Sequence, residues 1–248
     1  AYRWQRGSDK ISVGACLLAI SALGVVTTLA LWKALPAGYI AQKPNVRAEL
    51  KVLVRLPVIL ALLTTVLGSA AMFTLYTYIA PSLVEFTHAS PSFITLMLVL
   101  IGIGFSIGNH LGGKFADISI DKTLIGSLVL VIMMMLSFPM LAQSQIGAAI
   151  ALVIWGAATF ALVAPLQMRV MSVAHEASSL ASSVNIGAFN LGNALGAVAG
   201  AGVLSLGWSY SAVSSIGAVL AALGLFLVMI QIQLSRKSAL HYSASPQA

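Results

Sequence analysis

The sequence predicts an all-α polytopic membrane protein with seven transmembrane helices, six of which form an inverted three-plus-three repeat. Hydrophobic residues make up 59% of the 248-residue chain and charged residues only 8%, whereas soluble domains usually carry about 25% charged residues. Seven apolar runs reach the length of about 20 residues that a helix needs to cross a bilayer. A ten-residue pattern also occurs twice, inside the third and sixth of these runs.

The first four predicted spans are bounded by polar or turn-forming residues. The first covers residues 11–32, and a polar gap at 33–55 follows, in which Pro36 and Pro44 prevent one continuous helix. The second covers 56–80 and stops before Pro81. The third and fourth are 93–112 and 123–141.

The last three predicted spans cover 146–168, 184–206 and 210–233. Short stretches around Gln143–Gln145 and Gly207–Trp208 precede the fifth and the seventh. With alternating topology, spans two to four pair with spans five to seven, and span one is left over. This count indicates that the chain is part of something larger.

Lysine and arginine predict the orientation. If 33–55 is cytoplasmic, ten of the 13 basic residues lie on that side, and Arg3, Arg6 and Lys10 lie opposite. Because cytoplasmic loops are enriched in Lys and Arg, we expect a cytoplasmic C-terminus. The net charge of +7 is scattered at the ends of spans, so it does not indicate a nucleic-acid surface.

The repeat relates Gly104–Gly113 to Ala188–Ala197, 84 positions later, with five of ten positions identical. Such internal repeats are typical of secondary transporters, in which one repeat unit moves against another. Chance similarity in a chain rich in Gly, Ala and Leu is the alternative. Both copies carry glycines at every fourth position, which is one face of a helix where another backbone can approach closely. These glycine rows predict close helix packing, which is either static or sliding. The first row is Gly104, Gly108 and Gly112, and the second is Gly192, Gly196 and Gly200.

Several polar and aromatic side chains inside the spans are candidates for a substrate path. Amides are costly in a membrane unless they are paired or face water, so the asparagines line a path or join helices. The tyrosines belong either to an interfacial aromatic belt or to a pocket, and a tryptophan in mid-span favours a cavity wall. The candidate substrate-path residues are Tyr76, Tyr78, Trp155, Gln167, Asn185, Phe189, Asn190 and Asn193.

Other chemistry finds little support in the sequence. No Asp, Glu, Lys or Arg lies near the centre of a span, although ion-coupled pumps normally keep such a group in their path. The four histidines do not have metal-ligand spacing, and there is no phosphate-binding loop. We therefore expect no enzyme activity, no metal and no cofactor.

Four segments of the chain carry patterns that occur together in one protein family. Residues 108–117 read Gly-Asn-x-x-Gly-Gly-x-x-Ala-Asp, which matches that family's pattern between its eighth and ninth helices at every fixed position. Tyr78–Pro81 resembles the end of the seventh helix, Asn190–Gly196 resembles the eleventh, and the Arg3-Trp4 start is similar to the segment before the sixth. Through these segments the chain resembles the major facilitator superfamily, and more narrowly its drug:proton antiporter group, which includes arabinose-efflux-type permeases.

The resemblance implies that the chain is helices six to twelve of a twelve-helix transporter. Residues 1–55 would be the last helix of the N-terminal half with the central loop, 56–235 the six-helix C-terminal domain, and 236–248 a cytoplasmic tail. It places a conformational gating motif at Gly108, Asn109, Gly112, Gly113 and Asp117. The glycine rows would then pack against the missing N-terminal half. The family's arginines after the motif's Asp are absent here, so the charge pairing of this loop is expected to be weak.

The predicted function is secondary transport in a bacterial-type inner membrane, by alternating access. The solute would be small, such as a sugar or a drug-like compound, and would be exported in exchange for protons. The alternative is a non-transporting half-size protein or scaffold that dimerises through its glycine-rich helix faces.

Overall fold

The computed structural model describes the backbone of residues 2–34 and 46–244, and its regular structure in these ranges is entirely helical. By internal contacts the chain forms two compact units, Ala1–Pro44 and Asn45–Ala248. The described residues include seven segments that are long and apolar enough to cross a membrane, which confirms the predicted number. The loop with Pro36, Lys43 and Pro44 lies outside the described residues.

The described residues of the first unit form one helix, α1 (Tyr2–Ala34), which includes the predicted span 11–32. Thr27 and Thr28 sit within its apolar run. Their hydroxyls donate to the carbonyls of Leu23 and Gly24, both at 2.8 Å. These bonds keep the hydroxyls satisfied in a helix that is otherwise suited to lipid.

The second unit begins with a short amphipathic helix and continues with three of the predicted spans. Its first helices are α2 (Val46–Leu53), α3 (Leu56–Tyr76), α4 (Ile79–Thr87), α5 (Pro91–Ile118) and α6 (Ile120–Leu141). The second predicted span, 56–80, is too long, because α3 ends at Tyr76 and the chain turns at Thr77 and Tyr78 before α4 begins. The third predicted span, 93–112, is too short, because α5 extends six residues beyond 112.

The remaining helices of this unit are α7 (Gln145–Phe160), α8 (Val163–Val173), the 3-10 helix η1 (His175–Ala177), α9 (Ser178–Ser205) and α10 (Tyr210–Ala244). The fifth predicted span is therefore two helices. Pro165 has no N–H to offer the carbonyl of Ala161, so regular hydrogen bonding lapses at this point. Helix α9 begins earlier than the predicted residue 184, and α10 continues into the segment 236–248 that was predicted as a tail.

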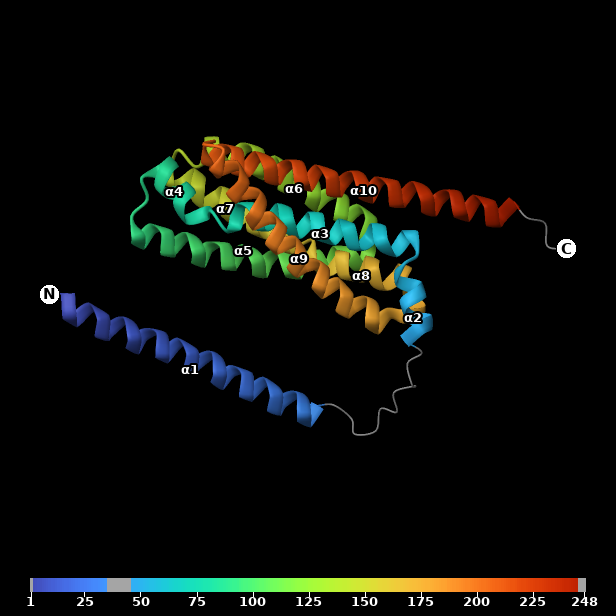
Figure 1. Ribbon diagram of the computed structural model, residues 1–248, viewed down its shortest axis with the longest axis horizontal. Coiled ribbons are helices and arrows are strands. Elements are labelled where there is room, and N and C mark those ends of the chain that lie inside the picture. The colour runs from blue at the N-terminus through green and yellow to red at the C-terminus, as the bar shows by residue number, and fades with distance from the viewer. Residues whose placement is uncertain (1, 35–45, 245–248) are drawn as a thin grey trace. The chain divides into compact units, whose positions relative to one another are not determined.

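The six spans of the second unit are paired across the repeat (Figure 1). Helix α3, the first of the first repeat, packs mainly on α9 and α10 of the second repeat. Helices α7 and α8, the first of the second repeat, pack on α5 and α6 of the first. Each repeat therefore completes the other, and the six helices form one body.

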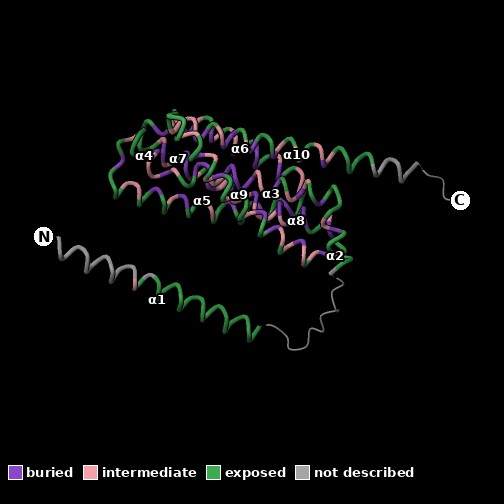
Figure 2. The backbone as a smooth tube through the Cα atoms, in the orientation of Figure 1, coloured by how far each residue is buried: buried purple, intermediate pink, exposed green. Residues whose placement is uncertain are grey.

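The main core lies between these helices and consists of large apolar side chains. Buried positions alternate with exposed ones along the membrane-spanning helices of the second unit (Figure 2). Leu75, Met97, Leu128, Phe138 and Trp155 are each no more than 1% exposed. A smaller cluster that includes Val52, Val170 and Ala181 joins α2 to α8 and α9 at one end.

Candidate functional site

The predicted gating motif lies almost entirely within α5 rather than in a loop. Gly108 and Gly112 are buried against α7 and the turn after it. A Cβ on Gly108 would overlap the carbonyl group of Ala157, and one on Gly112 would overlap that of Ala161. The glycines let the backbone of α5 contact the backbone of α7 and of the turn after it. This contact supports the part of α5 that extends beyond residue 112.

The second glycine row makes the equivalent contact on α9. A Cβ on Gly192 would overlap Ser69 and Val66 of α3, and one on Gly196 would overlap Ala70. Further along, the ring of Tyr78 lies directly against Gly200. Both rows therefore lie at equivalent interfaces: α5 on α7, and α9 on α3.

This geometry corrects two expectations. The glycine rows do not face a missing half, because helices of the same unit cover them. For the same reason they are not open faces through which a second copy could dimerise. The sequence could not indicate this, because a row of small residues predicts close packing without naming the partner helix.

The other motif residues lie on other faces of α5. Asn109 and Asp117 are exposed, and a Cβ on Gly113 would meet nothing within 4 Å. Residues 104–108 also have the Gly-x-Ser-x-Gly spacing of a hydrolase nucleophile, a match that the sequence reasoning overlooked. They lie in mid-helix, and the Ser106 hydroxyl donates to the Gly102 carbonyl at 3.0 Å. This is not the strand-to-helix turn that such a nucleophile requires.

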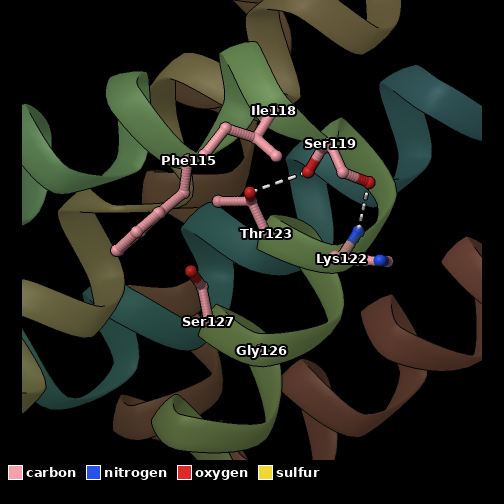
Figure 3. Close-up of a pocket in the computed structure, with 7 residues that line it drawn as sticks. All are labelled: Phe115, Ile118, Ser119, Lys122, Thr123, Gly126 and Ser127. Carbon is pink, nitrogen blue, oxygen red and sulfur yellow. Dashed lines mark hydrogen bonds between the residues drawn. The ribbon is translucent and has the colours of Figure 1, made fainter.

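A one-residue turn at Ser119 joins α5 to α6. Its hydroxyl accepts from the Lys122 backbone N–H at 3.3 Å, and its carbonyl accepts from the Thr123 hydroxyl at 2.8 Å (Figure 3). A cavity of about 380 Å³ lies beside this turn, between Phe115 and Ile118 of α5 and Gly126 and Ser127 of α6.

The expectation of weak charge pairing after Asp117 stays a prediction, because Asp117 is exposed and the ion pair of this segment is formed by another residue. Asp121, in the first turn of α6, forms an ion pair with Arg169 of α8, whose side chain is only 10% exposed. The partner lies 48 residues away, so the local pattern after Asp117 could not reveal it. The pair ties the turn between α5 and α6 to α8.

A second ion pair joins the start of α3 to η1. The guanidinium of Arg55 donates to both carboxylate oxygens of Glu176, each at 2.9 Å. The bonded carboxylate raises the pKa of Arg55. Since both side chains are about half exposed, the pair positions these segments more than it stabilises the fold.

Aromatic rings from three helices meet in the interior of the unit. Phe105 of α5 stacks on Phe160 at 3.9 Å between ring centroids, and it lies 5.9 Å from Tyr76 and 6.4 Å from Trp155. Tyr76 is 38% exposed, so this aromatic cluster reaches the surface there. Trp155 is 1% exposed, which places it inside the helix packing rather than on the predicted cavity wall.

Two of the predicted amides form a partly buried hydrogen-bonded chain between α8 and α9. Asn185 donates to the Gln167 side-chain oxygen at 2.6 Å, and Gln167 donates to the Ser182 hydroxyl at 2.6 Å. Asn185 is completely buried, and its Oδ1 has no hydrogen-bond partner in the described structure. The chain joins the helices and leaves one acceptor unused.

The other predicted residues lie elsewhere along α9 and at the end of α3. The hydroxyl of Tyr78, in the turn between α3 and α4, donates to the Ala197 carbonyl at 2.9 Å, so it fixes this turn against α9. Asn190 is exposed and donates to its own helix at Ile186, at 3.0 Å. Asn193 and Phe189 are partly buried.

Sequence reasoning missed Phe105, Phe160 and the role of Arg169. Phe105 follows the first glycine of the repeat directly, and Phe189 stands at the same place in the second copy. This correspondence with a predicted residue could have identified Phe105 from the sequence. Arg169 was counted only as a topology signal, although an arginine that folds back among apolar residues needs a partner.

The chain is similar to known proteins over most of its length. The family model described as Major Facilitator Superfamily matches residues 8–197. The chain is 60% identical over 213 residues to the inner membrane transport protein YdhP of Escherichia coli, covering 86% of this chain and 55% of that protein.

Two further relatives are more distant. An uncharacterized MFS-type transporter, YfhI of Bacillus subtilis, is 32% identical over 237 residues, which are 96% of this chain and 60% of that protein. A probable sugar efflux transporter of Helicobacter pylori is 30% identical over 207 residues, 82% of this chain and 52% of that protein. The chain thus spans a little over half the length of these relatives. With seven membrane helices, paired repeats and a family match over most of its length, the chain belongs to the Major Facilitator Superfamily of membrane transporters.

Proposed function

We propose that this chain is the C-terminal part of a twelve-helix transporter that exports a small solute from a bacterial cell. Helix α1 would be the sixth helix, and the second unit would be the C-terminal half. The observation that carries the proposal is the reciprocal pairing of the repeats. A body in which α5 packs on α7 and α9 packs on α3 through backbone contact moves as one piece.

The solute path runs along the aromatic cluster and the amide chain. Tyr76 and Phe105 offer ring faces on which a sugar ring or a flat drug-like molecule can stack, and Asn185 retains an acceptor inside an apolar region. A relative is named a probable sugar efflux transporter, which favours a sugar or a similar solute.

Protons are the proposed coupling ion, and the coupling acid belongs to the N-terminal half. Within the membrane spans of this chain, the acidic residues lie at helix ends rather than in mid-span. The ion pairs of Asp121 with Arg169 and of Arg55 with Glu176 lie at the end assigned to the cytoplasm. There they hold the turns between helices while the halves rock.

The competing function is a half-size scaffold that dimerises through glycine-rich faces. The burial of both glycine rows within the unit speaks against it. Solute accumulation distinguishes the two functions, because a transporter changes it and a scaffold does not.

The test measures accumulation of labelled sugars and drug-like dyes in cells that produce the complete protein carrying this chain. We expect lower accumulation of at least one solute, restored by a protonophore. Removing the ring in Tyr76→Ala should weaken export about fivefold, since stacking contributes about 1 kcal/mol. The control Phe226→Ala removes a ring of α10 that is 62% exposed and should change nothing. Unchanged accumulation of every solute would contradict the proposal.

A further inference from the structure

A second cavity lies at the end of the second unit where α3 begins and α8 ends. Its volume is about 190 Å³. Pro57 and Leu60 come from the first turns of α3, and Leu234 and Ser235 come from α10. Its other lining residues are Arg169, Val173 and Gln231. This cavity is separate from the aromatic cluster and from the amide chain.

Arg169 is the charged group of this cavity. The residue is 8% exposed, and one terminal nitrogen is paired with Asp121. Its Nε has no hydrogen-bond partner in the described structure. An unpaired donor on a buried guanidinium is costly, so the site is incomplete without an acceptor.

The charge around the cavity favours an anion. None of the residues that line it is acidic. Arg236 and Lys237 follow Ser235 directly on α10, and both are exposed. Asp121 balances part of the charge on Arg169, but its side chain is 45% exposed and is not among the lining residues.

The depth of the cavity matches the headgroup region of a membrane. Leu60 is the fifth residue of its span, which begins at Leu56, and Val173 is the last residue of its own span. Lys237 ends the span that contains Leu234. At this level, apolar walls can hold glycerol and the first methylenes of an acyl chain while a guanidinium binds phosphate.

We propose that this cavity binds an acidic phospholipid, with the phosphate on Arg169 and the glycerol between Leu60 and Val173. Arginine binds phosphate through several N–H groups at once, and basic pockets between membrane helices bind acidic headgroups. Bound there, the lipid joins α3, α8 and α10, and it shares Arg169 with the ion pair to Asp121. The state of that ion pair would then depend on the surrounding lipid.

The experiment is native mass spectrometry of the full chain, purified in detergent and stripped of lipid. Phosphatidylglycerol and phosphatidylcholine with the same acyl chains are added separately, and inorganic phosphate is added in a third arm. We expect about tenfold higher retention of phosphatidylglycerol, because only its headgroup carries a net negative charge. We expect inorganic phosphate at millimolar concentration not to displace it.

Leu60→Trp fills the cavity without removing the charge, and it should abolish the preference for phosphatidylglycerol. The matched control Leu63→Trp adds the same ring three residues away, at a side chain that is 45% exposed and does not line the cavity. Val173→Trp provides a second filling variant if Leu60→Trp does not fold. Equal retention of both lipids, an unchanged preference in a folded filling variant, or displacement by inorganic phosphate would overturn the proposal.

Discussion

Gly108 determines, at the scale of a single residue, how closely α5 and α7 approach. A Cβ on Gly108 would overlap the carbonyl oxygen of Ala157 and would lie 2.8 Å from its carbonyl carbon and α-carbon. Backbone cannot move aside as a flexible side chain can, so any larger residue must push the helices apart. Gly113, five residues further on, has nothing within 4 Å of an added Cβ.

We therefore expect Gly108→Leu to lower the free energy of unfolding by about 2 kcal/mol or more, because overpacking typically costs about 1–3 kcal/mol. Gly113→Leu is the matched control, with the same substitution on the same helix, and should leave stability unchanged. Thermal unfolding of both variants in detergent measures the difference. Equal melting temperatures would show that α5 and α7 are not in backbone contact.

The turn between α5 and α6 shows how elements are held together. Ser119 caps α6, and the following Asp121 reaches Arg169 on a helix from the other repeat. The ion pair therefore links the two repeats at one end of the body. Asp117, which the family resemblance singled out, is exposed on α5.

Removing the Asp121 charge should leave the buried Arg169 without its counter-ion. Breaking a buried ion pair costs about 3–5 kcal/mol, but Asp121 is 45% exposed, so we expect about 1–2 kcal/mol for Asp121→Asn. Asp117→Asn removes the same charge from the neighbouring turn and should have little effect on stability. Chemical denaturation in mild detergent compares the two variants, and a larger loss for Asp117→Asn would refute the assigned pairing.

At the scale of the whole molecule, the six spans of the second unit are connected alternately at one end and at the other. Arg55 and Glu176 lie in connections at one end, beside Lys122 in the first turn of α6. Glu85 and Gly207 lie in connections at the other end. The distribution of Lys and Arg predicts that the first end is cytoplasmic.

Cysteine labelling tests this orientation. In a Cys16→Ser background, we expect Glu85→Cys to react with a membrane-impermeant maleimide in intact cells. Lys122→Cys should react only after the cells are permeabilised. Both positions are exposed in the structure, so accessibility within the protein does not separate them. The reverse pattern of labelling would place the C-terminus outside.

The number of membrane helices, the internal repeat and the family resemblance could all be derived from the sequence. Span number follows from hydrophobic length, a property of consecutive residues that lipid selects directly. The repeat and the motif at 108–117 are also local patterns, and they predicted correctly that Gly104 and Gly192 mark helices of special packing. Gln167 and Asn185 were both chosen from sequence, but their hydrogen bond was not foreseen.

What only the tertiary structure decided is which residues meet. The glycine rows face α7 and α3 rather than a missing half, Asp121 pairs with Arg169, and Phe105 gathers rings from two other helices. The break before Val163 also needed the structure, although Pro165 supplies its cause. Each of these contacts joins residues far apart in the chain. In lipid, apolar helix faces differ little in their affinity for the solvent, so the fit of side chains between helices selects the partners.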